Sequence, residues 1–200
     1  MLLGVSSQQK DIYTPKLTFL VMTTAITLRK VQQKDAPLLV QWVNDRQNIQ
    51  YMSTLIRCKK HTLQSIQQEI RQADPSYERL FMVLCKGKRQ PIGHAGIDDI
   101  DTHDRRAEIF FLIGDKEEQG KGYSKDILMK LLDYAFTKMR LNSLFATATI
   151  RNIPSQKALE RAGFKRIGIR REYNNIGGKF MDEILYDMTA KEYRKKNAFR

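Results

Sequence analysis

The sequence predicts an α+β domain in which about seven strands and about four helices follow the order β-α-α-β-β-β-α-β-α-β-β. Two observations carry this prediction. Apolar residues recur with the spacing of a strand or of a helix in separate short segments, and turn-forming residues divide these segments. A length of 200 residues fits one domain. We expect an N-terminal extension over 1–22, one domain over 23–190 and a basic C-terminal tail over 191–200.

In the first half of the chain, an alternating apolar pattern predicts a strand over 25–31. A helix with one apolar face is expected over 35–43, followed by a loop over 44–60. A second amphipathic helix over 62–73 ends before a turn that contains proline. The next strands are expected over 80–86, 91–99 and 106–113. The last of these has a continuous apolar run, which is typical of a central strand.

In the second half, the segment 120–139 is the longest predicted helix, because its apolar side chains form one stripe. This stripe consists of Ile127, Leu128, Leu131, Leu132, Ala135 and Met139. A strand is expected over 144–150 and a helix over 154–162, which Gly163 ends. Two closing strands, which flank a turn rich in Asn and Gly, are expected over 164–171 and 179–188.

The composition excludes several classes of protein. Hydrophobic residues make up 42% of the chain and charged residues 28%, which is typical of a globular domain and not of a disordered chain. No apolar run is long enough to span a membrane, so we expect no membrane partner. Two cysteines are too few for a disulfide scaffold, and a cytoplasmic location is the simplest expectation.

The net charge of +13 is concentrated at the two ends of the chain, with +6 over 1–60 and +8 over 140–200. Such a surface attracts anionic partners, such as nucleotides, phosphorylated cofactors or the ribosome. A solvated basic surface is the other explanation of the same charge. The sequence has no arginine-rich block and no zinc-ligand spacing, so nucleic acid is not expected as a direct ligand.

The strongest local signal is the segment 119–124, Gln-Gly-Lys-Gly-Tyr-Ser, between an apolar strand and the longest helix. Glycines let the backbone approach a ligand closely, and free amides at the start of a helix bind phosphate. The segment is not a Walker loop, because Gly122 follows Lys121. It is not a dinucleotide-binding fingerprint either, because Lys125 stands where a third glycine is needed. Taken alone, it is equally well explained as a tight turn.

A second signal follows the next strand. Asn152 precedes a short helix, Ser155 lies one helical turn further, and the helix ends in Gly163-Phe164. Taken alone, these residues are helix caps. In combination, the order strand, Gln-Gly-x-Gly, helix, strand, Asn-x-x-Ser, helix, Gly-Phe resembles the GNAT family of acetyl-CoA-dependent N-acetyltransferases over about residues 25–190.

Other segments resemble the branch of this family that contains ribosomal-protein N-terminal, polyamine and amino-sugar acetyltransferases. These segments are Trp42-x-Asn44-Asp45, Ala107-Glu108-Ile109, Ile113-Gly114-Asp115-Lys116 and Gly178-Lys179-x-x-Asp182-x-x-x-Tyr186. The resemblance implies the GNAT fold, with a mixed, mostly antiparallel sheet that is splayed where acetyl-CoA lies between the central strands. It also implies that an acetyl group passes from acetyl-CoA to a primary amine by direct attack in a ternary complex, without a metal.

The resemblance also implies the residues that bind the cosubstrate acetyl-CoA. Amides at the start of the longest helix would hold its pyrophosphate, and the backbone of the preceding strand would hold its pantetheine arm. One of these strand amides would stabilise the oxyanion as it forms. The residues implied are Phe111, Leu112, Ile113, Gln119, Gly120, Lys121, Gly122, Tyr123, Ser124, Asn152 and Ser155.

The group that protonates the leaving thiolate is not fixed by the sequence. Many family members carry a tyrosine for this step, and the corresponding position here is Leu159. Tyr186, Ser155 or a water molecule are the alternatives. Asn152 matches the asparagine that the family places near the amine, so the resemblance gives it a catalytic role.

A base is needed because a protonated amine has no lone pair with which to attack. Glu108, at the start of the central strand, is the first candidate, and an ion pair with Arg105 or Arg106 is the alternative for this residue. An acidic patch around the same hairpin is either a recognition site for a cationic amine or a solvated turn. Its members are Asp98, Asp99, Asp101 and Asp104.

The net charge favours an amino-sugar nucleotide or a ribosomal N-terminal amine as the acceptor, because a polycation would be repelled. A polyamine is the third alternative. Two other functions are left open, namely a basic module that binds nucleic acid or the ribosome, and a GNAT domain that binds CoA without turnover. A homodimer is also left open.

Overall fold

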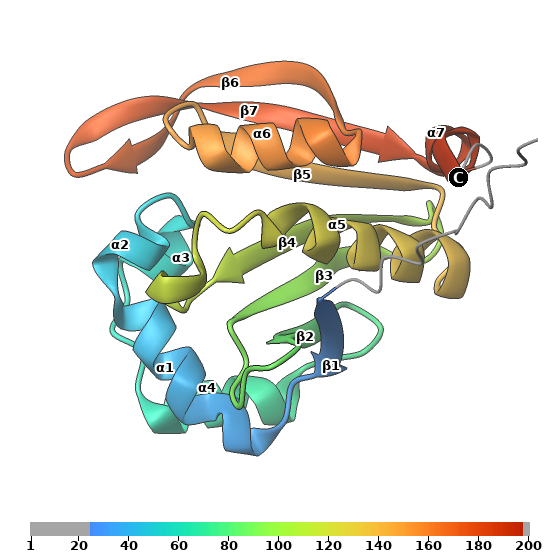
Figure 1. Ribbon diagram of the computed structural model, residues 1–200. Helices are drawn as coiled ribbons and strands as arrows, with labels where there is room; N and C mark the ends of the chain where they lie inside the picture. The colour runs from blue at the N-terminus through green and yellow to red at the C-terminus, as the bar shows by residue number, and fades with distance from the viewer. Residues whose placement is uncertain (1–24, 198–200) are drawn as a thin grey trace, which may run out of the picture.

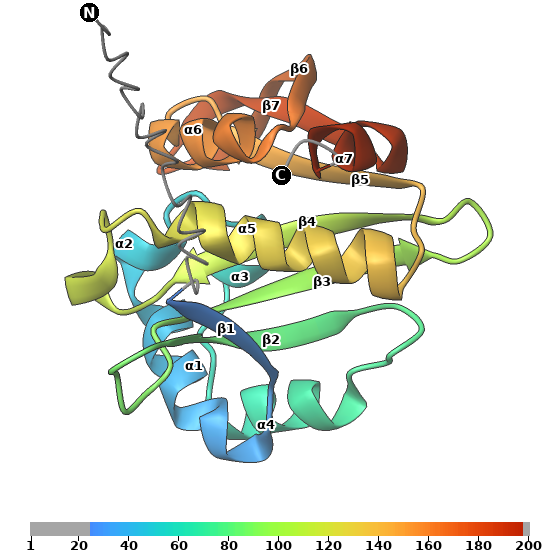
Figure 2. The same cartoon turned by 45° about the vertical axis from the view of Figure 1, so that its right-hand side comes forward.

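The computed structural model describes residues 25–197 as one sheet with helices on both faces (Figures 1 and 2). The extension expected over 1–22 lies outside the described residues. The strands are β1 Ile26–Lys30, β2 Arg79–Cys85, β3 Gly93–Asp101, β4 Arg106–Ile113, β5 Ser143–Thr149, β6 Lys165–Ile176 and β7 Lys179–Thr189. The helices are α1 Ala36–Asn44, α2 Arg46–Ile49, α3 Thr54–Arg57, α4 Leu63–Gln72, α5 Tyr123–Asp133, α6 Ile153–Ala162 and α7 Ala190–Asn197. Short 3-10 turns cover Gln33–Asp35 and Lys116–Glu118, and a π-helical turn covers Tyr134–Lys138.

The seven strands are arranged in the order β1-β2-β3-β4-β5-β7-β6. All neighbours run antiparallel except β4 and β5, which are parallel. These two strands share only three residue pairs, from Arg106 with Ser143 to Glu108 with Phe145, and then diverge (Figure 1). The prediction of an α+β fold with a mixed, mostly antiparallel and splayed sheet is therefore confirmed.

Alternation along β4 sends its side chains to two different layers. Ala107 and Ile109 pack under α5, on which the four residues Ile127, Leu128, Leu131 and Leu132 are completely buried. Leu112 points to the other face and joins a second apolar cluster around Trp42 of α1. Figure 2 shows α5 on one face of the sheet, with α1 and α4 on the other. The apolar stripe that predicts the longest helix is therefore the face that this helix buries.

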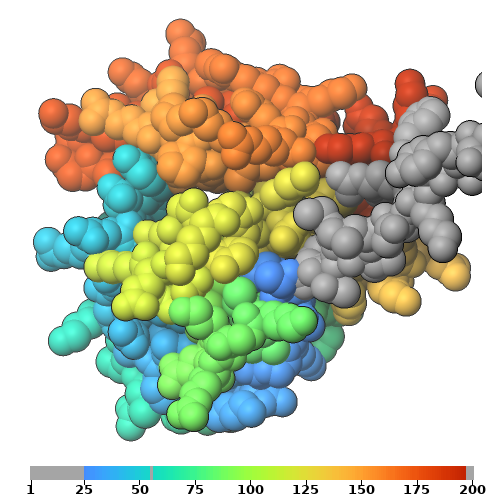
Figure 3. Space-filling view, viewed as in Figure 1, coloured from blue at the N-terminus to red at the C-terminus, as the bar shows by residue number. Residues whose placement is uncertain are grey.

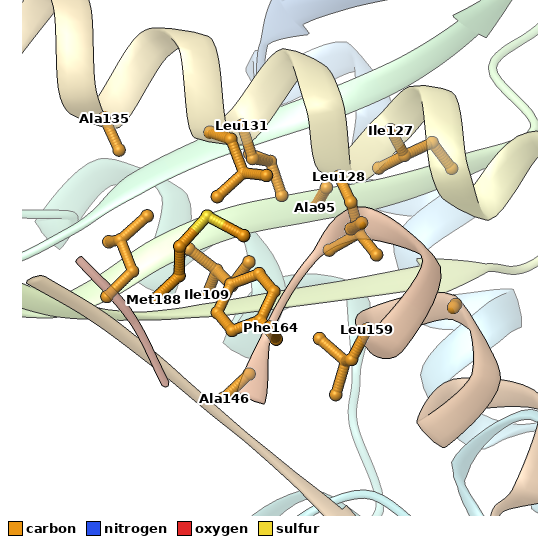
Figure 4. Close-up of a cluster of buried hydrophobic side chains, with 14 of the residues drawn as sticks. Ala95, Ile109, Ile127, Leu128, Leu131, Ala135, Ala146, Leu159, Phe164 and Met188 are labelled. Atoms are coloured by element: carbon orange, nitrogen blue, oxygen red, sulfur yellow. The ribbon is translucent and has the colours of Figure 1, made fainter. Parts of the chain in front are cut away.

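Helix α6 covers the other half of the sheet. Leu159 of this helix lies in the same apolar cluster as Ala146, Phe164, Met188 and the buried face of α5 (Figure 4). Each fully buried aliphatic side chain contributes about 1.5–3 kcal/mol to stability. The two halves of the splayed sheet are therefore held together mainly by this shared core, because their backbone pairing is short.

The structure differs from the expected elements in two places before β5. The segment 44–60, expected as a loop, contains the short helices α2 and α3. The helix expected over 120–139 begins only at Tyr123, because Gly120 and Gly122 have positive φ angles of 76° and 86°. These glycines therefore form a loop before the helix and not its first turn.

The C-terminal residues differ as well. Residues 191–197, expected as a basic tail, belong to α7. Tyr193 of this helix is 8% exposed, its ring lies 5.1 Å from that of Phe136, and its hydroxyl donates to Asp133 at 3.3 Å. One aromatic anchor among many basic residues therefore docks a segment whose overall composition suggests a tail.

Among residues 25–197, no helix combines the length and the apolar character that crossing a membrane requires. The cytoplasmic location stays a prediction.

A tight contact between β3 and β4 provides a test of this packing. A Cβ atom at Gly93 would lie 2.1 Å from the carbonyl oxygen of Leu112, a backbone atom that cannot move without distorting the central strands. We expect Gly93→Ala to lower the free energy of unfolding by about 1–3 kcal/mol or more, as overpacking does. Gly168→Ala is the matched control, because its Cβ would meet Leu185 at an ordinary 3.7 Å. Urea unfolding measures both variants, and equal stabilities would contradict the packing described.

Candidate active site

The divergence of β4 from β5 leaves one edge of β4 without a neighbouring strand beyond Glu108. The amide of Gly114 donates to the carbonyl of Ile92 at 3.0 Å. Along an antiparallel pair, every second residue of a strand forms its backbone hydrogen bonds with the neighbouring strand, and the residues between them face away from it. By this alternation the backbone groups of Leu112 face β3, whereas those of Phe111 and Ile113 face the divergence. Of the three strand residues implied for the pantetheine arm, only Phe111 and Ile113 can therefore offer their amides to a ligand.

The glycine loop presents further amides next to this edge. Gly120 and Gly122 both have positive φ, and a Cβ atom at either would meet no atom within 4 Å. Gly122 is the N-cap of α5 without a side-chain cap, and within 25–197 no backbone hydrogen bond engages the amides from Gly120 to Ser124. The start of a helix carries a partial positive charge, so this arrangement is suited to a phosphate group.

Side chains behind the loop hold it in place. The amide group of Gln119 donates to the carbonyl of Ile113 at 2.8 Å. Glu118, which has no exposed surface, pairs with Lys88 at 2.5 Å and with Lys121 at 3.0 Å. These hydrogen bonds lower the pKa of Glu118. The side chains of Gln119 and Lys121 therefore support the loop, and Glu118 is a buried charge that the sequence analysis missed.

Asn152 and Ser155 lie at the start of α6. The side-chain oxygen of Asn152 accepts a hydrogen bond from the Ser155 amide at 3.3 Å, which is the helix-capping role. In the described part of the chain, the Ser155 hydroxyl has no hydrogen-bond partner. Leu159, at the position of the family's tyrosine, is 2% exposed and lies in the apolar core (Figure 4). This position therefore supplies no proton.

Tyr186 lies on the face of the sheet that α6 covers. Its side chain is 1% exposed, and its hydroxyl donates to Glu160 at 3.3 Å. Burial, followed by the charge of Glu160, raises the pKa of Tyr186. Phe145 of β5 pairs with Glu108 of β4 and with Asp187 of β7, and paired residues point to the same face of a sheet. Tyr186 precedes Asp187 in β7, so it points to the face opposite Glu108. Both residues therefore border the cavity described next, but their side chains point to opposite faces of the sheet.

A cavity of about 790 Å³ lies on the face of the sheet opposite α5 and α6. Strands β4 and β5 form its floor. Residues just before and within α3 form one wall, and the β6–β7 hairpin forms another. Its charged lining residues are Asp99, Arg106, Glu108, Arg170 and Glu183.

Glu108 lines this cavity and stands directly opposite Asp98 on β3. Burial, followed by the charge of Asp98, raises the pKa of Glu108 to about 7. Burial, followed by the charge of Glu78, raises the pKa of Asp98 to about 6. Because the charge of Asp98 raises the pKa of Glu108, the titration of Glu108 is coupled to that of Asp98. A carboxylate with such a pKa can accept a proton from an amine.

A β-bulge turns Asp99 into the same cavity. In a regular strand, consecutive residues point to opposite faces, so Asp98 and Asp99 would not both lie on the side of Glu108. The register between β3 and β4 shifts after Asp98, and Asp99 has a φ of +48°. Such a conformation costs a residue other than glycine about 1 kcal/mol or more, and strain of this kind is concentrated at functional sites.

The two arginines of the cavity are already paired. Arg106 lies 3.3 Å from Asp101, and Arg170 lies 3.0 Å from Glu183 and 4.8 Å from the centre of the Tyr173 ring. The ion pair considered for Glu108 with Arg106 is therefore not formed. Among the residues that the structure describes, Asp98, Asp99 and Glu108 have no cationic partner. The cavity is thus locally acidic in a chain whose net charge is +13.

The sequence analysis identified these three carboxylates but missed the pair of Arg170 and Glu183. For Glu183, the alternation of side chains along β7 was an available signal, because it places Glu183 on the face of the sheet opposite the apolar Ile184. Arg170 lies across a hairpin with two irregularities of register, which no local pattern predicts.

Comparisons with known proteins agree with this arrangement. Residues 25–165 match the family model of the acetyltransferase (GNAT) domain. An uncharacterized N-acetyltransferase, p20 of Bacillus licheniformis, is 31% identical over 178 residues, which are 86% of this chain and 96% of p20. The putative ribosomal N-acetyltransferase YdaF of Bacillus subtilis is 32% identical over 101 residues, 50% of this chain and 55% of YdaF.

A solved structure has a similar fold. Spermidine N-acetyltransferase from Vibrio cholerae, in complex with CoA and spermine, matches 84% of this chain and 98% of its own chain with a TM-score of 0.76. Its 23% identity supports the fold alone. These findings do not favour a nucleic-acid-binding module or a domain without turnover. The chain belongs to the GNAT family of acetyltransferases, and it transfers an acetyl group from acetyl-CoA to an amine.

Proposed function

We propose that the acceptor is a primary amine on a molecule with a further positive charge, such as a polyamine, and that Asp98, Asp99 and Glu108 recognise it. One observation carries this proposal: Asp99 and Glu108 line one cavity, Asp98 pairs with Glu108 on the next strand, and the arginines of the cavity are paired with other residues. An ammonium group in the cavity supplies the missing cation and forms charge-assisted hydrogen bonds. The Vibrio cholerae enzyme of similar fold is named for such an acceptor.

The net charge alone favours an amino-sugar nucleotide or a ribosomal N-terminal amine. Surface charges act over long distances only weakly, because salt screens them beyond about 8 Å at physiological ionic strength. Inside the cavity, both lining arginines are ion-paired, whereas the carboxyl groups of Asp99 and Glu108 form no ion pair with a described residue. A protein N-terminal amine is the second candidate, because its usual pKa of about 7.7–8.0 lies close to that of Glu108. The homodimer remains a prediction.

The chemistry divides between the two faces of the sheet. Glu108 accepts the proton of the ammonium group, which frees the lone pair that attacks the acetyl carbonyl. The amides of Phe111 and Ile113 hold the pantetheine arm and stabilise the oxyanion, and the amides from Gly120 to Ser124 bind the pyrophosphate. The amine and acetyl-CoA then meet between the diverging strands, as direct attack in a ternary complex requires.

Two residues of α6 complete the proposed site. Ser155 relays a proton from a water molecule to the leaving thiolate and stays a hydroxyl, because its hydroxyl is free in the described part of the chain whereas that of Tyr186 is bound to Glu160. Asn152 fixes the start of α6 through its cap and orients Ser155.

The glycine loop provides the first test. In Gly122→Val, a β-branched residue would have to adopt a φ near 86°, and its side chain would fill the space left for phosphate. We expect the folded variant to lose the increase in Tm that acetyl-CoA produces. Gly177→Val is the matched control, because its φ is +60° and its surroundings are equally open, but it lies in the β6–β7 turn. Unchanged acetyl-CoA affinity in Gly122→Val would exclude the loop as the phosphate site.

Glu108→Gln tests the base. We expect acetyl-CoA binding to persist and kcat to fall by roughly 10²–10⁴-fold, the range for positioned acid–base groups. The wild-type rate should rise with pH through about 7, where Glu108 loses its proton, and the rate of the variant should not show this rise. Asp98→Asn should shift the rise in rate to lower pH, because it removes a neighbouring negative charge. A variant Glu108→Gln with nearly normal turnover would rule out Glu108 as the base.

The same group gives a prediction for stability. The folded-state pKa of Glu108 lies above its usual 4.5, so folding favours the protonated form. The stability that this group contributes is fully present below pH 4.5 and is lost as the pH rises through about 7. Glu108→Gln should therefore raise Tm relative to the wild type more at pH 8 than at pH 5. A Tm difference that does not change between these pH values would contradict the raised pKa.

An acceptor panel tests the charge of the cavity. We expect spermidine to be acetylated with a higher kcat/KM than an amino-sugar nucleotide. Asp99→Asn should lower kcat/KM for spermidine by about 3–10-fold, as expected for one partly exposed charge contact. Asp104→Asn is the matched control, because Asp104 does not line the cavity and faces Arg106. A preference for the nucleotide that Asp99→Asn leaves unchanged would refute the proposal.

A further inference from the structure

The acceptor-side cavity lies between two halves of the sheet that share little backbone pairing, because β4 and β5 pair over only three residues. Ser53 and Thr54 line one wall, which belongs to the first half of the chain. Tyr173 and Asn174 line the opposite wall, which is the β6–β7 hairpin. Figure 3 shows the cyan atoms near residue 50 against the orange atoms of the second half. The width of the cavity therefore depends on what joins these two walls.

Arg57, the last residue of α3, joins them. Its Nη1 donates to the carbonyl of Asn175 in the hairpin at 2.9 Å. Its Nε donates to the carbonyl of Met52 at 2.6 Å, and its Nη2 donates to the hydroxyl of Thr54 at 3.2 Å. All three guanidinium nitrogens are therefore engaged. Because a guanidinium presents its donors in one rigid plane, the bonds to Met52 and Thr54 orient the group, and the bond to Asn175 joins α3 to the hairpin.

The acceptors of these bonds lie next to, or among, the residues that line the cavity. Thr54 is itself a lining residue. Asn175 follows Asn174, whose side chain donates to Glu183 on the cavity wall at 3.1 Å. Within 25–197, no other hydrogen bond joins the segment from α2 to α3 with the β6–β7 hairpin. In the described part of the chain, the hydrogen-bonded connection between the two walls is thus made by one side chain.

We propose that Arg57 is a positioning residue that sets the width of the acceptor cavity and thereby selects acceptor amines by size. The inference rests on the proposed function, in which this cavity receives the amine. Arg57 acts through Thr54 and the hairpin and does not touch the reacting atoms. Without its three bonds, the walls separate, a slender amine loses contact with both, and a bulkier amine gains room.

Steady-state kinetics with three diamines test this inference. Putrescine and its derivatives with a benzyl or a naphthylmethyl group on the distal nitrogen share the reacting amine and the distal charge, and differ in bulk. In Arg57→Ala, we expect KM for putrescine to rise roughly tenfold, while KM for acetyl-CoA stays within about twofold. The ratio of kcat/KM for the bulky diamines to that for putrescine should rise by at least about tenfold. Arg57→Lys should give an intermediate profile, because one ammonium cannot span all three acceptors.

Arg46→Ala is the matched control, because Arg46 is exposed on α2 and makes no hydrogen bond or ion pair in the described part of the chain. We expect it to keep the wild-type selectivity. An unchanged size ratio in Arg57→Ala, or equal changes in KM for the amine and for acetyl-CoA, overturns the inference. Turnover by the wild type is a separate outcome: if no diamine is acetylated, the proposed acceptor class is wrong.

A distance measurement tests Arg57 even in that case. Cys58 is exposed and Cys85 is buried, so one spin label can be placed on Cys58 and another on Lys179→Cys in the hairpin. In Arg57→Ala, the distribution of distances between the labels should broaden and lengthen relative to the protein with Arg57. An identical distribution in the two proteins overturns the inference.

Discussion

The short parallel pairing of β4 and β5 is the constraint on which the rest of this structure depends. The two strands share three residue pairs, and from there β4 has a free edge in the middle of a seven-stranded sheet. Unpaired backbone groups inside a protein are costly unless a partner satisfies them. Here the free amides of Phe111 and Ile113 lie beside those at the start of α5, so one ligand can satisfy both sets. The same divergence opens the sheet between its two faces, and in the proposed mechanism this opening allows two substrates bound on opposite faces to react.

The electrostatics of the site follow from this division. The proposed cosubstrate side would offer helix amides to phosphate, and the positive charge of the chain would suit an anionic ligand there. On the other face, a bulge turns Asp99 toward Glu108, and the two arginines of the cavity are paired with Asp101 and Glu183. Net charge therefore describes how ligands approach the molecule, whereas the pairing of individual side chains decides which charge the cavity presents.

Much of the fold was predictable from the sequence, because it depends on periodic patterns. The stripe on α5 and the alternation in the strands predicted the element order, although the helix expected from residue 120 begins only at Tyr123. The rest depends on single contacts. One tyrosine docks α7, a positive φ at Asp99 reverses the direction of one side chain, and Arg57 joins segments that are far apart in the sequence. The burial of the Glu118 charge also depends on a single contact, because its partner Lys88 comes from a turn between two other strands. None of these contacts has a period that a sequence pattern could reveal.

In the proposed mechanism, the carboxyl groups of Asp98 and Glu108 also couple folding to catalysis. As the pH rises through about 7, Glu108 ionises beside Asp98, and a second negative charge appears in a half-buried site without a cation. The fold is therefore weakened over the pH range in which Glu108 would act as the proposed base, and the apolar core on the opposite face must offset this cost. An ammonium group in the cavity would neutralise the pair and lower the pKa of Glu108. Binding of the acceptor and ionisation of the base then favour each other, so a cationic acceptor would ionise the group that removes its own proton.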